Sequence, residues 1–137
     1  MCGGVFYTLG GQEYRVYFPN PKATLPVKMK TGAIEQLPWG RRKQQHGELP
    51  MGGWARLVSI YGGRWDRWQP KPIKLSSSSF MEKDIERNSH WYDISAGKFI
   101  QGLVARVNHE QRVYVVTVEP EMDEAVHDRW PRILSGY

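Results

Sequence analysis

Glycine turns divide the start of this chain into short β-rich segments. Residues 5–9 and 12–18 are joined by Gly10-Gly11. A two-residue glycine link of this kind favours a tight hairpin, because glycine adopts positive φ angles without steric cost. A second hairpin shows the same pattern in residues 25–30, the turn Thr31-Gly32 and residues 33–37. The opening of the chain therefore predicts antiparallel strands.

Later segments continue this pattern, and we expect further strands at residues 54–61, 73–82, 90–94, 99–107 and 112–118. A loop at residues 38–53 and a short helical turn within residues 62–72 lie between them. One longer helix is expected, because Pro120 precedes an acidic turn and Pro131 prevents continuation beyond about His127. We predict an α+β fold: a β-dominated single domain over residues 1–137, with a mixed or barrel-like sheet and few short helices.

Charge and composition limit the classes of function. Nineteen Lys and Arg against fourteen Asp and Glu give a net charge of +5, which suits a polyanionic partner or simply a well-solvated surface. The single cysteine excludes an intramolecular disulfide, and no apolar run is long enough to cross a bilayer. The start of the chain does not resemble a signal peptide. We expect a cytoplasmic monomer without a membrane partner.

Cys2 is the first candidate for chemistry. Removal of Met1, which is favoured when residue 2 is small, would give Cys2 a free amine beside its thiol. An α-amine has a pKa near ~8 and is partly neutral at physiological pH, so it can condense with an aldehyde. The thiol can then close a five-membered thiazolidine ring. The alternative is a chance cysteine at a flexible terminus.

Two further side chains could move protons. Glu82 ends a mostly uncharged segment and could act as a general acid or base, or could simply pair with Lys83 or Arg87. His127 lies beside Asp128 and Arg129, which suits proton transfer or a phosphate contact, and the alternative, favoured on this feature alone, is a histidine that caps the C-terminus of a helix. The other histidines show no metal-ligand spacing. We expect no metal and no cofactor.

Cationic and aromatic residues alternate through the middle of the chain. Arginine contacts to phosphate and base stacking on tryptophan hold single strands without sequence choice. The alternative is that the tryptophans fill the core and the arginines solvate its rim. We predict DNA contacts from Trp39, Arg41, Arg42, Trp54, Arg56, Trp68 and Arg129.

The order of these motifs resembles the SRAP family, the SOS-response-associated peptidases. The resemblance spans nearly the whole chain and is carried by Met1-Cys2-Gly3, residues 19–21, Trp39-Gly40, Ala55-Arg56, residues 80–83 and residues 127–131. It implies a protein of the DNA-damage response that shields abasic sites in single-stranded DNA through a covalent thiazolidine. It also implies removal of the protein's own Met1 and an association with the nucleoid.

The resemblance also implies roles for individual residues. Cys2 would be the nucleophile, Glu82 the acid/base that helps to open the sugar ring, and His127 a helper at the sugar or the 3′ phosphate. Arg56 and Arg129 would hold phosphates, and Trp39 would stack near the lesion. The chain departs from the family pattern at four positions, since Gly4 stands for Arg, Trp54 for Asn, Val58 for Glu and Trp130 for Met.

Three functions are therefore open. The first is covalent capture of abasic DNA, which depends on a free N-terminal Cys2. The second is reversible single-stranded DNA binding with Cys2 inert, which would survive Cys2→Ala and weaken with salt. The third is a thiol peptidase or amidase that uses Cys2, His127 and Glu82 and turns over a peptide substrate.

Overall fold

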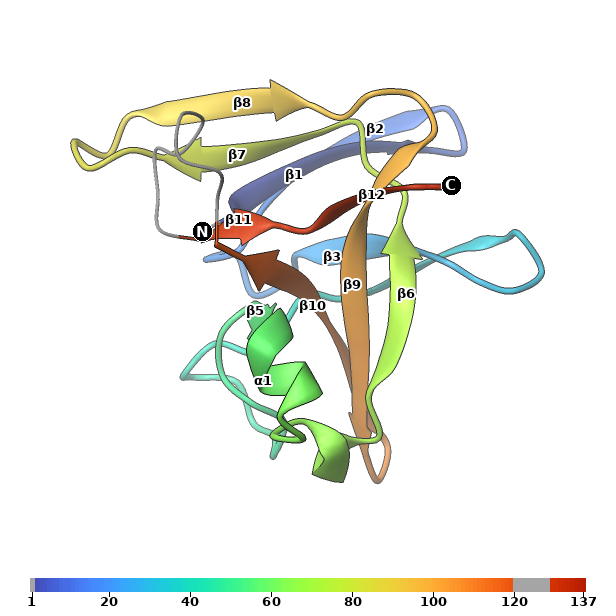
Figure 1. The fold of residues 1–137 in the computed structure, drawn as a ribbon, viewed down its shortest axis with the longest axis vertical. Coiled ribbons are helices and arrows are strands. Elements are labelled where there is room, and N and C mark those ends of the chain that lie inside the picture. The colour runs from blue at the N-terminus through green and yellow to red at the C-terminus, as the bar shows by residue number, and fades with distance from the viewer. Residues whose placement is uncertain (1, 120–128) are drawn as a thin grey trace.

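The computed structural model describes residues 2–119 and 129–137, and most of them lie in strands (Figure 1). The strands are β1 (Cys2–Leu9), β2 (Gln12–Tyr17), β3 (Thr24–Lys28), β4 (Ile34–Pro38), β5 (Trp54–Arg56), β6 (Lys71–Leu75), β7 (Ser79–Lys83), β8 (Ser89–Asp93), β9 (Lys98–Val107), β10 (Glu110–Val118), β11 (Trp130–Pro131) and β12 (Ile133–Ser135). Two short helices accompany them, α1 (Leu57–Tyr61) and the 3₁₀ turn η1 (Asp66–Trp68).

The strands form two sheets that pack against each other. The smaller sheet has the order β2-β1-β7-β8 and lies across the top of Figure 1. The larger sheet has the order β11-β10-β9-β6-β3-β4, with β12 paired to β9 and β5 running parallel to β10. The parallel pair among antiparallel ones confirms the prediction of a β-dominated fold with a mixed sheet.

The larger sheet curls but does not form a closed barrel. Trp39, just after β4, makes an isolated bridge to Val113 of β10. Within the described residues no continuous ladder of hydrogen bonds joins β4 to β10. The sheet is therefore open, and the prediction of a barrel-like sheet is not confirmed. The curl gives the larger sheet a concave face, and the smaller sheet covers part of it.

The predicted N-terminal hairpins are confirmed, with β1 paired to β2 and β3 to β4. The single strand expected at residues 54–61 is wrong, because β5 ends at Arg56 and α1 follows. Leu57 and Ile60 are three residues apart and both pack against buried residues, so a helical turn places them on one face.

The single strand expected at residues 73–82 is also wrong. It is divided between β6 in the larger sheet and β7 in the smaller sheet, and residues 76–78 carry the chain from one to the other. The two short strands β11 and β12 were not predicted. The expected helix near Pro120–His127 lies outside the described residues.

Two apolar clusters stabilise the fold. The larger cluster lies between the sheets and includes Cys2, Val5, Phe80, Ile100 and Val113. The second cluster lies on the other face of β9 and β10, where α1, η1 and the loop of residues 41–53 cover it. In the part of the chain that the structure describes, we find no helix that is both long and apolar enough to cross a bilayer.

Candidate functional site

A β-bulge sets the direction of the Cys2 side chain. Cys2 lies opposite Glu82, whereas Gly4 lies opposite Met81, so β1 has one residue more than β7 between these pairs. In a regular strand Cys2 would share the face of Gly4, away from the buried Val5. The extra residue reverses that assignment, since a bulge re-aims the side chains next to it. Cys2 therefore joins Val5 in the core between the sheets.

Cys2 and Glu82 form a buried cross-strand pair. Both side chains are completely buried, with 0% of their surface exposed. Residues directly opposite each other in antiparallel strands have Cβ atoms about 4.5–5.5 Å apart, so the thiol and the carboxyl group are neighbours. Burial, followed by the charge of Glu82, raises the pKa of the Cys2 thiol well above its ordinary value. The thiol donates a hydrogen bond to the Gly4 carbonyl oxygen, at 3.4 Å.

Trp54 holds the backbone of Cys2 from the opposite sheet. Its indole Nε1 donates to the Cys2 carbonyl oxygen at 2.7 Å. The half-buried ring of Trp54 packs on Phe18, with 4.8 Å between ring centres. The DNA contact expected of Trp54 stays a prediction, and the structure adds a contact with the candidate nucleophile. It stands where the family pattern has Asn, and it contacts the Cys2 backbone through one N–H.

Arg56 and Arg129 lie beside the end of β10. Thr117 of β10 is paired with Arg56 of β5 and with Pro131 of β11, two residues beyond Arg129. The N-terminal end of β1 and the ends of β10 and β11 lie close together in Figure 1. Arg56 is exposed and Arg129 is half-buried. The resemblance implied phosphate contacts for these two cations, and the fold brings their strands to the end of the molecule where β1 begins.

Trp39 is a core residue. It is fully buried, and its Nε1 donates to the Gly53 carbonyl oxygen at 3.0 Å. Its ring packs edge-on against Phe18 at 5.6 Å between ring centres. The prediction that Trp39 stacks near a DNA lesion does not fit this position, because no face of the ring is accessible to a base. The alternative interpretation of the Trp-Gly motif, a filled core, fits the structure.

Arg41 and Arg42 hold a loop together through hydrogen bonds to backbone carbonyl groups. Arg41 donates to the carbonyl oxygens of Leu49 and Gln45, at 2.7 and 2.9 Å. Arg42 is 6% exposed and donates to the carbonyl oxygens of Phe18 and Trp39, at 2.5 and 2.7 Å. Burial and the charge of Arg112 lower the pKa of Arg42. The expected phosphate contact of buried Arg42 is therefore corrected to contacts with backbone carbonyl groups, whereas that of half-buried Arg41 stays a prediction.

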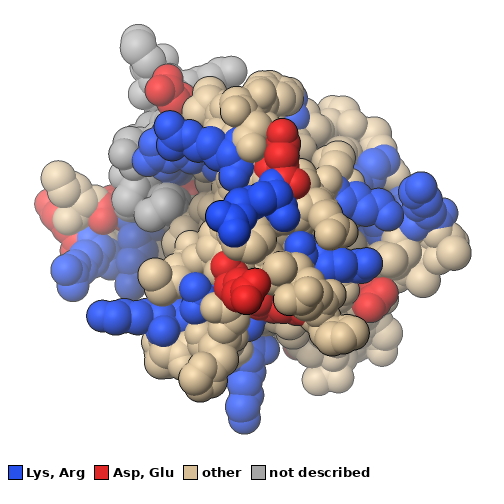
Figure 2. Space-filling view, turned by 90° about the horizontal axis from the view of Figure 1, so that it is seen from below, with Lys and Arg blue, Asp and Glu red and all other residues tan. Residues whose placement is uncertain are grey.

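Trp68 retains an accessible surface. It is half-buried at the end of η1, and the guanidinium of Arg67 lies 4.4 Å from the centre of its ring. Figure 2 looks onto the molecule from the α1 end and shows Lys and Arg side chains spread over this face, with acidic side chains more restricted. The face is compatible with contacts to phosphate groups.

The sequence analysis missed His90 as a functional candidate. His90 of β8 lies directly opposite Glu82, on the side of β7 away from Cys2. The spacing of the residues along the chain gives no sign of this pairing, because it depends on the register of β7 and β8. His127, the third predicted catalytic residue, lies outside the described residues.

No group of three or more potential ligands among the described His, Cys, Asp and Glu residues is arranged to hold a metal ion. Comparison with known proteins adds no relative to this description. No family model, no curated protein and no solved structure matches the chain.

Proposed function

We propose that this protein, once Met1 is removed, captures the aldehyde of an abasic site in single-stranded DNA as a thiazolidine on Cys2. The observation that carries the proposal is the buried pair of Cys2 and Glu82, placed opposite each other by a bulge in β1. A cysteine at position 2 with a carboxyl group beside its thiol supplies a nucleophile and a proton carrier in one place.

The chemistry balances without a cofactor. The amine of Cys2 adds to the aldehyde carbon, and the thiol then adds to the resulting imine. One C–N bond and one C–S bond form, and both bonds between the aldehyde carbon and its oxygen break. The oxygen leaves as water with both amine protons when the imine forms, and the thiol proton then ends on the nitrogen of the ring.

Glu82 is suited to carry these protons. The raised pKa of the Cys2 thiol keeps it protonated at neutral pH, so a base must remove its proton as the C–S bond forms. The carboxyl group of Glu82 lies across the strand pair and can accept that proton, then deliver it to the imine nitrogen. The same group can exchange protons with the sugar while its ring opens.

The surroundings of this pair support a DNA substrate. Arg56 and Arg129 flank the end of β10 on the side of the molecule where β1 begins, and both are at least partly accessible. Arginine side chains bind phosphate through several N–H donors at once. We assign to these two residues the contacts with the strand on either side of the lesion, which fits an association with the nucleoid.

The test is a denaturing gel of processed protein mixed with an oligonucleotide that carries one abasic site. Intact mass spectrometry first confirms the loss of Met1. We expect a shifted band that survives denaturant, that disappears in Cys2→Ala and that forms slowly in Glu82→Gln. An equal band in Cys2→Ala would contradict capture by the N-terminal cysteine, and so would the absence of any band from fully processed wild type.

A second function is favoured by one observation, the pair of Arg67 and Trp68, in which the arginine is exposed and the tryptophan half-buried. This pair suits reversible binding of single-stranded DNA through stacking and phosphate contact. It predicts binding to an intact oligonucleotide that weakens with salt and in Trp68→Ala, and that is unchanged in Cys2→Ala.

A further inference from the structure

Three side chains of unlike chemistry occupy one row across three strands of the smaller sheet. Glu82 of β7 is opposite Cys2 of β1 on one side and opposite His90 of β8 on the other. Because directly opposed residues share a face of a sheet, all three side chains emerge on the inner face. The burial of β8 agrees, since His90 and Tyr92 are half-buried while Trp91 and Asp93 are exposed.

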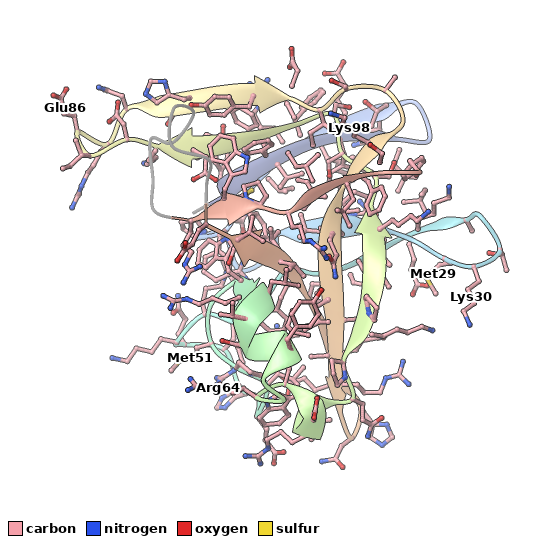
Figure 3. The ribbon with its side chains drawn as sticks, viewed as in Figure 1. Met29, Lys30, Met51, Arg64, Glu86 and Lys98 are labelled. Carbon is pink, nitrogen blue, oxygen red and sulfur yellow. The ribbon has the colours of Figure 1, made fainter. Side chains whose placement is uncertain are left out.

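His90 is oriented by Asp84. The Nε2 atom of His90 lies 2.8 Å from Oδ2 of Asp84. The other oxygen, Oδ1, accepts backbone N–H groups from Glu86 and Asn88 at 2.9 Å each, which fixes the carboxylate in the β7–β8 turn. Figure 3 marks this turn by Glu86, at the end of the sheet where β1 begins. Neutral His90 therefore carries its proton on Nε2, and its Nδ1 lone pair is left to accept a proton.

The exposure of the groups changes along this row. Glu82 is completely buried, whereas 42% of the His90 side chain and 22% of the Asp84 side chain are exposed. A buried carboxyl group that moves protons during a reaction needs a path by which its protonation state equilibrates with water. We propose that the Asp84–His90 pair is a proton relay between Glu82 and solvent. This inference rests on the proposed function, in which Glu82 is the proton carrier for Cys2.

The relay has a defined proton balance. When Glu82 holds a proton that it must lose before the next step, His90 accepts the proton on Nδ1 and becomes a cation stabilised by the Asp84 carboxylate. The imidazolium then releases a proton to water, and neutral His90 is restored. The reverse sequence reloads Glu82. No bond to carbon changes in these transfers, and His90 is a positioning residue that acts through Glu82.

Few other charges face His90 in the described part of the sheet. Cys2 of β1 and Glu82 of β7 lie on the same face, and Asp84 of the β7–β8 turn contacts His90. Lys83 is opposite Ser89 and emerges on the other face. Arg87, in the β7–β8 turn, is exposed. The described charged groups that bear on the relay are therefore Glu82 and the pair of His90 and Asp84.

The test measures the rate of cross-link formation from pH 5 to 9 in Met1-processed wild type, His90→Gln and Asp84→Asn. The matched control is His109→Gln, which removes an exposed imidazole from the β9–β10 turn. We expect His90→Gln to slow capture about 10-fold, less than the roughly 10²–10⁴-fold effect of a group that transfers the proton to substrate. We also expect the dependence of the rate on pH in His90→Gln and in Asp84→Asn to differ from that of wild type.

Chemical rescue separates a relay from a structural role. Added imidazole should restore at least part of the rate of His90→Ala, in proportion to the concentration of its neutral form, and should leave wild type unchanged. Variants with wild-type rates and pH profiles would overturn the relay while the cross-link itself remained. A slow variant that imidazole does not rescue, and that keeps the wild-type pH profile, would overturn it equally. Absence of any cross-link from processed wild type would overturn the proposed function and the relay together.

Discussion

The indole N–H of Trp54 donates to the carbonyl oxygen of Cys2, so a residue of the larger sheet fixes the first residues of the smaller one. The two atoms are 2.7 Å apart. The contact joins β5 to β1 across the interface between the sheets. It gives the N-terminal strand a fixed end at the residue where a reactive terminus would otherwise fray.

Loss of this hydrogen bond should slow capture without unfolding the protein. Trp54→Phe keeps an aromatic ring against Phe18 but removes the N–H donor. One hydrogen bond contributes about 1 kcal/mol, which corresponds to roughly fivefold in rate if the bond is needed to align Cys2. The measurement is the rate of cross-link formation, with Trp68→Phe as the control. An unchanged rate in Trp54→Phe would mean that the contact does not position Cys2.

Arg42 should matter for stability and not for DNA affinity. Arg42→Ala removes donors from the carbonyl oxygens of Phe18 and Trp39 and leaves them buried, which we expect to cost about 2–4 kcal/mol. Urea unfolding followed by fluorescence measures the change. Lys43→Ala, at the exposed neighbouring position, should leave the unfolding midpoint where it is. A large loss of DNA affinity in folded Arg42→Ala would contradict this assignment.

Gly53 allows two aromatic rings to meet. A Cβ atom at this position would lie 2.6 Å from Cδ1 of Phe18 and 2.7 Å from Nε1 of Trp39. Gly53→Ala should therefore lower the free energy of unfolding by about 1–3 kcal/mol, as other overpacked cores do. Phe18→Leu makes room on one side, so the double variant should lose less than the sum of the single variants. Additive losses would show that the rings do not cause the strain.

The buried thiol should make stability depend on pH in the alkaline range. The pKa of Cys2 is raised in the folded chain, so between its ordinary value near 9 and its folded value only the unfolded state loses the proton. The stabilisation is thus fully present below about pH 8 and falls as the pH rises, by up to about 1.4 kcal/mol per pH unit.

The measurement for this effect is urea unfolding of the unprocessed chain and of Cys2→Ser between pH 7 and 10.5. The stability difference between the two should shrink as the pH rises. Cys2→Ser keeps Tyr114, whose pKa burial also raises, so this second group cancels in the comparison. A difference that stays constant with pH would mean that the thiol is not protected from ionisation.

The features predicted best from the sequence are turns and hairpins, which depend on residues that are neighbours in the chain. Gly10-Gly11 and Thr31-Gly32 mark tight turns, and both hairpins formed as expected. The sequence did not show where residues 73–82 change sheets, because each half alone satisfies the pattern of a strand. The choice between one strand and two is made by pairing partners that are distant in the chain.

The candidate site could be predicted only in part, because its geometry also depends on strand pairings between residues that are distant in the chain. Cys2 and Glu82 were both selected from the sequence, but their direct opposition depends on the bulge in β1. The tryptophans and arginines were harder to assign, because cations beside aromatic rings occur both on nucleic-acid surfaces and around buried loops. Arg42 and Trp39 belong to the second case, and burial decides between the two.

The bulge between Cys2 and Gly4 adds one residue to β1, so the face on which Cys2 lies depends on the number of residues before Val5. With one glycine fewer between Cys2 and Val5, the alternation of the strand would run unbroken, and position 2 would again share the inner face with Val5, opposite Glu82. The direction of the nucleophile is therefore compatible with two strand lengths, one with the bulge and one in which the bulge and one glycine are both absent.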